Sequence, residues 1–371
     1  MNKRLVAALT LAAIVVAPAL MTGSRVLAHG PFFGAVYTMS NAAAGNAVLT
    51  FLRLPDGSLV RAGATPTGGS GTGGGLGNQN GLVLTPNERW LLAVNAGSDT
   101  VTTFEVGHLG LRRRDVQPSG GLLPISIAVH RDLVYVLNAL SDSIAGFRLT
   151  RQGMLHPIPG SIRSLSTSGA GPAQISFSPD GDVLVVTEKA TNKIVTFLVD
   201  RDGLPGAIHV NASNGATPFG FAFGKRGELF VSEAFGGAPD ASAVSSYLVD
   251  DDGSVQTISP SVGTTETAAC WVAVTPNGRF VYATNTGSGS VSGYAVDFDG
   301  TIELLGDGRS GVTGDGSGPI DLAITDGGRF LYTLNAGTHT LGAFLVKHDG
   351  GLTRLRFVSG LPEAASGLAA R

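Results

Sequence analysis

Seven copies of one strand-and-turn pattern predict an all-β fold, a seven-bladed β-propeller with four-stranded antiparallel blades. The first observation is a strand that ends in Asn or Glu about every 49 residues, at Asn41, Asn95, Asn138, Glu188, Glu233, Asn285 and Asn335. The second is a turn glycine with the same spacing, at Gly57, Gly110, Gly153, Gly203, Gly253, Gly300 and Gly350. Because two independent landmarks agree in every copy, we expect each copy to be one blade.

The composition agrees with strands and argues against other classes. The 371 residues include 54 glycines, roughly twice the usual share, and a glycine costs a helix interior about 1 kcal/mol relative to alanine. With 43% apolar residues and a net charge of -3, the chain is not expected to be disordered. The near balance of 25 basic and 28 acidic residues gives no pattern for nucleic-acid binding.

The N-terminal residues 1–28 predict a secretory signal peptide. A positively charged start precedes an apolar stretch over residues 5–20, and residues 26–28 form a small-residue cleavage motif. The stretch is shorter than the ~20 residues that span a bilayer, so no stable membrane insertion is expected. An uncleaved anchor is the alternative. We expect residues 29–371 to form a single propeller domain that is monomeric and either secreted or periplasmic.

Each repeat contains the same elements in the same order. An inner strand, a Pro-Asp-Gly type turn and the strand ending in Asn or Glu come first; a small-residue loop, a third strand, an Asp-Gly turn and an outer strand follow. The clearest copies are residues 172–205, 269–302 and 319–352. The first copy, 34–59, lacks the inner strand, whereas residues 366–371 resemble an inner strand with nothing after it. The C-terminal segment is therefore predicted to complete blade one and to remove an exposed edge.

This order assigns residues to the two faces of the ring. We call the face on which the inner strands begin the top face, so the Asn or Glu positions and the crossings between blades lie there. The two longest loops, residues 63–78 and 234–243, also fall on the top face. Function usually lies on loops that a rigid scaffold holds, so we expect a site at the top mouth. The glycine-rich loop matches G-x-G-x-x-G at Gly69–Gly74 but lacks the strand and helix of a nucleotide site, and we interpret it as a flexible crossing.

Two adjacent blades carry a carboxylate where five blades carry Asn. Glu188 and Glu233 are therefore our candidate catalytic residues. A carboxylate there can orient or deprotonate an attacking water, and a second carboxylate nearby raises one pKa into a useful range. The alternative is that each Glu accepts the loop hydrogen bonds that Asn makes elsewhere.

Five other side chains are candidates for substrate binding at this mouth. Gln174, Trp271 and Asp321 share one position of the inner strand, Glu266 lies on the approach to blade six, and His339 is on a top loop. Trp271 can stack on a ring and Asp321 can hold a hydroxyl group. The alternative is that the shared position packs between blades. No histidine pair has ligand spacing, so the sequence predicts no metal site and no cofactor.

The strand endings carry a resemblance to a known family. Residues 332–335 (YTLN), 281–285 (VYATN) and 134–138 (VYVLN), each followed by a small-residue loop, resemble the seven-bladed lactonase family, with its 6-phosphogluconolactonase-like and muconate-cycloisomerase-like propellers. The resemblance implies a hydrolase that opens a small lactone. The phosphogluconolactonase type has a His-rich approach to an inner strand, but residues 171–174 and 268–271 contain no histidine. Together with the predicted export, this favours a non-phosphorylated lactone.

Two alternatives to this interpretation remain open. One is a non-catalytic binding or scaffolding propeller that recognises a glycan, a peptide or an envelope partner. The other is a divalent cation in the channel between Glu188, Glu233 and Asp321, since six-bladed gluconolactonase-type propellers use a central ion.

Overall fold

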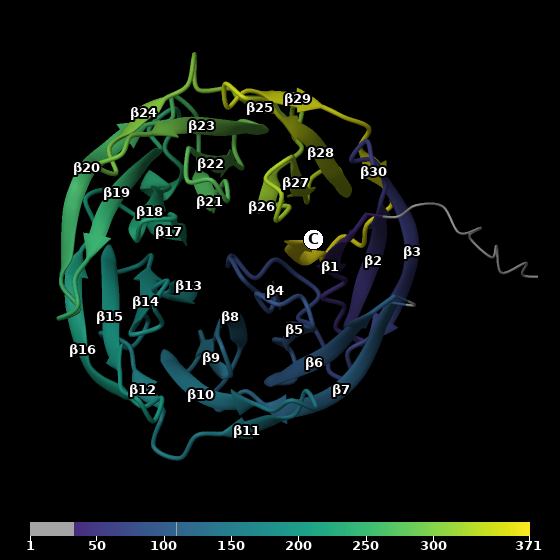
Figure 1. The fold of residues 1–371 in the computed structure, drawn as a ribbon, viewed down its shortest axis with the longest axis vertical. Coiled ribbons are helices and arrows are strands. Elements are labelled where there is room, and N and C mark those ends of the chain that lie inside the picture. Colours follow the sequence, from purple (N-terminus) through teal and green to yellow (C-terminus); the bar gives the residue numbers. More distant parts are fainter. Residues whose placement is uncertain (1–32, 109) are drawn as a thin grey trace, which may run out of the picture. The chain divides into compact units, whose positions relative to one another are not determined.

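The computed structural model describes residues 33–108 and 110–371, which form a ring of seven antiparallel sheets around a central channel (Figure 1). This confirms the predicted seven-bladed propeller. The predicted signal peptide, residues 1–28, lies outside the described residues. In the described part of the chain, no helix has the length and apolar character needed to cross a membrane.

The first three blades follow one another around the ring, and each is given from the channel outward. Blade 1 contains β31 (Ser366–Ala370), β1 (Ala35–Met39), β2 (Ala47–Arg53) and β3 (Leu59–Pro66). Blade 2 contains β4 (Leu82–Leu84), β5 (Trp90–Asn95), β6 (Thr100–Gly107) and β7 (Gly110–Pro118). Blade 3 contains β8 (Pro124–His130), β9 (Leu133–Asn138), β10 (Ser143–Leu149) and β11 (Leu155–Pro157), with β12 (Arg163–Ser164) also paired to β10.

The remaining blades repeat this plan. Blade 4 contains β13 (Pro172–Phe177), β14 (Val183–Glu188), β15 (Lys193–Val199) and β16 (Pro205–Ala212). Blade 5 contains β17 (Pro218–Phe223), β18 (Glu228–Glu233), β19 (Ala243–Val249) and β20 (Val255–Gly263), with the 3₁₀ turn η1 (Phe235–Gly237) between β18 and β19. Blade 6 contains β21 (Ala269–Val274), β22 (Phe280–Asn285), β23 (Ser290–Val296) and β24 (Ile302–Leu304), with β25 (Gly311–Val312) on β23. Blade 7 contains β26 (Pro319–Ile324), β27 (Phe330–Asn335), β28 (Thr340–Val346) and β29 (Leu352–Arg354), with β30 (Val358–Ser359) on β28.

The C-terminal strand closes the ring, as the sequence predicts. β31 pairs antiparallel with β1, with Leu368 opposite Thr38 and Ala370 opposite Val36. In every other blade a bottom turn joins the inner strand to the second strand. Blade 1 has no such turn because its two inner strands come from distant parts of the chain. The bottom face is therefore open at this blade.

The repeated turn glycines are explained by contacts between blades. Gly57 and Gly350 have φ values of 86° and 83°, in the left-handed region that favours glycine. A Cβ on Gly57 would overlap the ring of Phe330, and one on Gly350 would overlap the ring of Phe280, both on the preceding blade. Tyr332 also donates its hydroxyl to the Gly57 carbonyl at 2.8 Å. The repeat thus records a packing requirement of the ring.

Candidate functional site

The top-rim carboxylate of blade 4 is buried and hydrogen-bonded. Glu188 ends β14 and has no exposed surface. It accepts hydrogen bonds from the Ser166 backbone N–H at 2.9 Å, the Ser166 hydroxyl at 2.5 Å and the Thr191 hydroxyl at 2.6 Å. The two bonds from Ser166 attach the crossing before blade 4 to the end of its second strand.

The carboxylate of blade 5 has a similar environment. Glu233 ends β18, is fully buried, and accepts the Gly215 N–H at 2.9 Å. Hydroxyl groups supply three further hydrogen bonds, from Ser245 at 2.6 Å, Ser261 at 2.6 Å and Tyr247 at 3.3 Å. With four hydrogen bonds, the acceptor positions of Glu233 are occupied, and this carboxylate must lose a partner before it can bind a water. The catalytic role of Glu188 and Glu233 stays a prediction, and their geometry is that of structural anchors.

The shared inner-strand position connects neighbouring blades. Gln174 donates to the Phe221 carbonyl at 2.8 Å and accepts the Phe221 N–H at 2.7 Å, so that blade 4 is joined to blade 5. Asp321 accepts the Leu322 N–H at 2.8 Å and is also hydrogen-bonded by the Leu368 N–H of blade 1. Both side chains are buried. Each covers the free edge of the next inner strand, whose backbone groups would otherwise lack partners.

In blade 5 the shared position is Gly220, and a side chain from elsewhere in the chain fills the space. Gln79 donates to the Val272 carbonyl at 2.7 Å and accepts the Val272 N–H at 3.0 Å. A Cβ on Gly220 would overlap the side-chain carbonyl oxygen of Gln79. Gln79 thus does for blade 6 what Gln174 does for blade 5, although it comes from the crossing between blades 1 and 2.

The tip of this crossing, residues 77–80, crosses the top of the channel, and we call it the strap. Figure 1 shows the segment before β4 reaching toward the centre of the ring. Trp271 donates its indole N–H to the Asn78 carbonyl at 2.5 Å, and Lys189 donates to the Gly77 carbonyl at 2.7 Å. Ile127 donates its N–H to the Asn80 carbonyl at 2.9 Å. The strap therefore contacts blades 3, 4 and 6, and it occupies the position at which the sequence places a substrate.

The other top-face candidates have partners in the protein or lie in turns. Glu266 is buried and accepts Arg309 Nε at 2.5 Å and the Ser290 hydroxyl at 2.9 Å. His339 lies half-buried in the turn between β27 and β28. Cys270, on β21, is not among these candidates, and burial raises the pKa of its thiol to about 12, so this thiol is a poor nucleophile at neutral pH.

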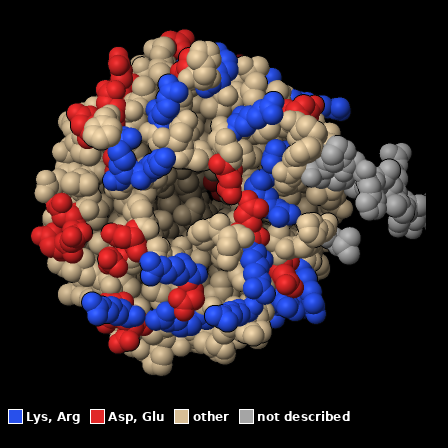
Figure 2. Space-filling model, in the orientation of Figure 1, with Lys and Arg blue, Asp and Glu red and all other residues tan. Residues whose placement is uncertain are grey.

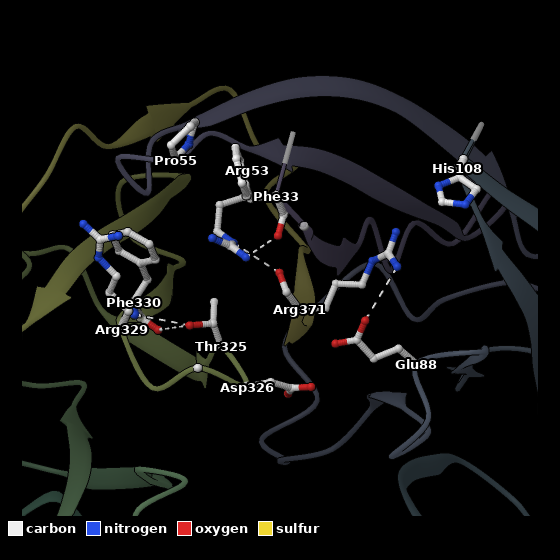
Figure 3. Close-up of a pocket in the computed structure, with 12 residues that line it drawn as sticks. Phe33, Arg53, Pro55, Glu88, His108, Thr325, Asp326, Arg329, Phe330 and Arg371 are labelled. Atoms are coloured by element: carbon white, nitrogen blue, oxygen red, sulfur yellow. Dashed lines mark hydrogen bonds and ion pairs between the residues drawn. The ribbon is translucent and has the colours of Figure 1, made fainter. Parts of the chain in front are cut away.

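An open cavity of about 730 Å³ lies on the bottom face, where blade 1 lacks its turn. Figure 3 shows its lining, which comes from blades 1, 2 and 7. Two carboxylates, Glu88 and Asp326, line it together with Arg371. Glu88 and Asp326 also line the channel cavity of about 400 Å³. Figure 2 shows the hollow at the centre of this face. We call the larger of the two cavities, with a volume of about 730 Å³, the carboxylate groove.

Both carboxylates replace residues that favour the bottom turn. In blades 4 and 6 the turns read Ser-Pro-Asp-Gly (178–181) and Thr-Pro-Asn-Gly (275–278). Glu88 stands at the glycine position with φ 52°, a conformation that is strained for a residue with a side chain, and Asp326 stands at the proline position. Backbone strain of this kind is concentrated at functional sites. These two departures from the turn pattern are a sequence signal that points to the bottom face. The residues at the strand ends point to the top face, and a prediction that rests on them therefore misses this signal.

The two carboxyl groups interact electrostatically. Partial burial raises the pKa of Glu88 above its usual range, and a hydrogen bond and like charge from Asp326 raise it further. Arg371 opposes this shift from 3.7 Å. Glu88 therefore binds a proton more readily than an exposed glutamate does.

Two further arginines line the same cavity. Arg53 donates to the carbonyl oxygens of Phe33 and Arg371 and lies 5.5 Å from the centre of the Phe330 ring. Arg329 lies 5.1 Å from the same ring. The carboxylate groove thus combines two neighbouring carboxyl groups with guanidinium groups, which can stabilise negative charge on an oxygen atom. Among the described residues, no group of three His, Cys, Asp or Glu side chains is placed to hold a metal ion.

Comparison with known proteins agrees with this architecture. The family model of the seven-bladed β-propeller lactonases matches residues 80–252 and 241–366, and the chain belongs to this family. A 6-phosphogluconolactonase of Yersinia enterocolitica is 23% identical over 158 residues, which are 40% of this chain and 47% of that protein. The aligned segment thus spans about half the length of this relative.

Solved structures show the same fold at low identity. The periplasmic gluconolactonase of Pseudomonas aeruginosa matches with a TM-score of 0.70 and 18% identity, over 91% of this chain and 98% of that chain. A protein of Lactobacillus plantarum matches with a TM-score of 0.71 and 16% identity, over 91% of this chain and 99% of that chain.

Proposed function

We propose that this protein is an exported hydrolase that opens a small, non-phosphorylated lactone in the carboxylate groove. The observation that carries the proposal is the Glu88–Asp326 pair in the lining of the cavity, where partial burial and Asp326 together raise the pKa of Glu88. Membership of the lactonase family, and relatives that bear the names 6-phosphogluconolactonase and gluconolactonase, support the reaction class.

The chemistry requires one base and one acid. Asp326 accepts a proton from a water whose oxygen attacks the lactone carbonyl carbon. Arg371 and Arg329 line the cavity and offset the negative charge that develops on the carbonyl oxygen. The bond between the carbonyl carbon and the ring oxygen then breaks. Glu88 gives its proton to that oxygen, and the product is the open hydroxy acid.

The test measures hydrolysis of a panel of lactones, with glucono-1,5-lactone and its 6-phosphate included. We expect Glu88→Gln and Asp326→Asn each to lower kcat about 10²- to 10⁴-fold, the usual contribution of a positioned acid or base. Glu303→Gln, an exposed glutamate on β24, is the matched control and should keep full activity. Full turnover in both groove variants contradicts the proposal. Loss of activity only in Glu188→Gln or Glu233→Gln places the site on the top face instead.

The same preparation reports on export when the chain is expressed from residue 1. A mature N-terminus at His29 in an exported fraction is the expected result. Unprocessed protein inside the cell contradicts it. If no lactone is hydrolysed while a glycan array gives a hit, the binding alternative replaces the enzyme.

A further inference from the structure

A second groove on the bottom face lies between blades 2 and 3, and we call it the arginine groove. Its volume is about 480 Å³, within the range of small-ligand sites. Arg89, Arg131 and Arg151 line it. Figure 2 shows Lys and Arg side chains gathered on the part of this face over blades 2 and 3. None of the three arginines lines the carboxylate groove.

The charge of the arginine groove is not neutralised by the protein. Over residues 33–108 and 110–371, none of its three guanidinium groups forms an ion pair. The acid in its lining, Asp132, is already paired with Arg148 at 2.9 Å. Three uncompensated guanidinium groups around one cavity favour an anionic ligand.

One of these arginines occupies a strained backbone position. Arg131 is the first residue of the two-residue turn between β8 and β9, with φ 54°. The first strand-to-strand turn of each later blade has glycine in this region of φ, at Gly181, Gly227, Gly278 and Gly328. Backbone strain at Arg131 therefore accompanies a guanidinium group at the arginine groove, just as strain at Glu88 accompanies a carboxylate at the carboxylate groove.

Apolar side chains also line the groove, and one of its polar atoms has no partner. The apolar lining is Pro86, Trp90, Leu149 and Pro179, and the Arg89 guanidinium lies 4.9 Å from the centre of the Trp90 ring. His130 lines it as well, and its Nε2 atom is buried with no hydrogen-bond partner in the described residues. Apolar side chains beside charged groups suit a ring that carries an anionic substituent.

We infer that the arginine groove binds an acidic sugar, with the anionic substituent on the guanidinium groups and the ring against the apolar side chains of the lining. A carboxylate and a phosphate ester share this chemistry, because the planar guanidinium fork matches the oxygens of both. Binding of the acidic sugar does not depend on lactone hydrolysis, since the arginine groove is separate from Glu88 and Asp326.

The experiment is calorimetric titration of the mature protein with glucuronate, glucose 6-phosphate and glucose at low ionic strength. We expect one of the two acidic sugars, and not glucose, to bind, and the tighter of the two identifies the anion. In Arg131→Gln/Arg151→Gln, binding should weaken at least about tenfold, given the strength of charged hydrogen bonds. The control Arg201→Gln, an exposed arginine in the turn between β15 and β16 of blade 4, should bind like the wild type.

Two results overturn the inference. One is an equal affinity for glucose and for both acidic sugars, and the other is an unchanged Kd in the double variant. Melting temperatures of all variants show whether each is folded. The Glu88→Gln variant separates this site from the hydrolase, because it should lose turnover and keep acidic-sugar binding.

Discussion

Asp321 couples the stability of the closing blades to pH. Burial raises the pKa of this carboxyl well above its ordinary value of 3.8, and the N–H groups of Leu322 and Leu368 offset only part of the shift. The folded state then binds a proton that the unfolded state releases. The contribution of this group to the free energy of unfolding is fully present at pH values below its ordinary pKa. It is lost as the pH rises toward the raised pKa of the folded state.

Replacing Asp321 with Asn should remove this part of the pH dependence. We expect the melting temperature of Asp321→Asn to fall less than that of the wild type between pH 4 and pH 8. Thermal scans across this range measure the difference. Asp315→Asn, at an exposed position, is the control and should follow the wild type. Parallel curves for Asp321→Asn and the wild type contradict the assignment.

The strap shows how one element depends on a missing side chain in another. Gln79 reaches Val272 only because Gly220 has no Cβ. A methyl group on Gly220 would overlap the side-chain oxygen of Gln79, and it would lie 2.5 Å from the carbonyl oxygen of Cys270. The strap in turn receives hydrogen bonds from Trp271 and Lys189. Burial lowers the pKa of Lys189 to about 8, so this bond involves an ammonium group at neutral pH.

Gly220→Ala should displace the strap. Overpacking of this kind costs about 1–3 kcal/mol, and we expect faster amide exchange and proteolysis over residues 69–81. Gly263→Ala is the control in the same blade, because its Cβ meets nothing within 4 Å. If exchange in this segment is the same in both variants, the strap is not held by the Gly220 gap. A Gln79→Ala/Gly220→Ala double variant should show a smaller loss than the two single losses combined.

The whole ring depends on the pairing of β31 with β1. Deletion of residues 362–371 removes this pairing, exposes the edge of β1, and uncovers apolar surface that β31 buries, including Leu368. A fully buried aliphatic side chain contributes about 1.5–3 kcal/mol. We expect the melting temperature to fall by at least about 10 °C, measured by calorimetry. An unchanged melting temperature contradicts the closure mechanism.

The spacing of the strand ends and turn glycines was sufficient to predict the number of blades. The order of elements within each repeat predicted the strand order, and the incomplete first copy together with the C-terminal segment predicted the closing strand. These features are local or periodic, so one copy checks the next. The position of Glu188 and Glu233 at the ends of β14 and β18 was predicted on the same basis. Their hydrogen-bond partners were not, because Ser166 and Ser261 come from irregular segments that do not repeat.

By itself, then, the sequence determined a closed ring of seven sheets, because periodic strands with buried faces have few other ways to satisfy their edges. Only the tertiary structure decided which end of the channel is open. That depends on single contacts between distant blades: Gln79 in the space above Gly220 covers the top, and the missing turn of blade 1 brings Glu88 and Asp326 together at the bottom. Such contacts have no period along the chain, and folding alone brings them together.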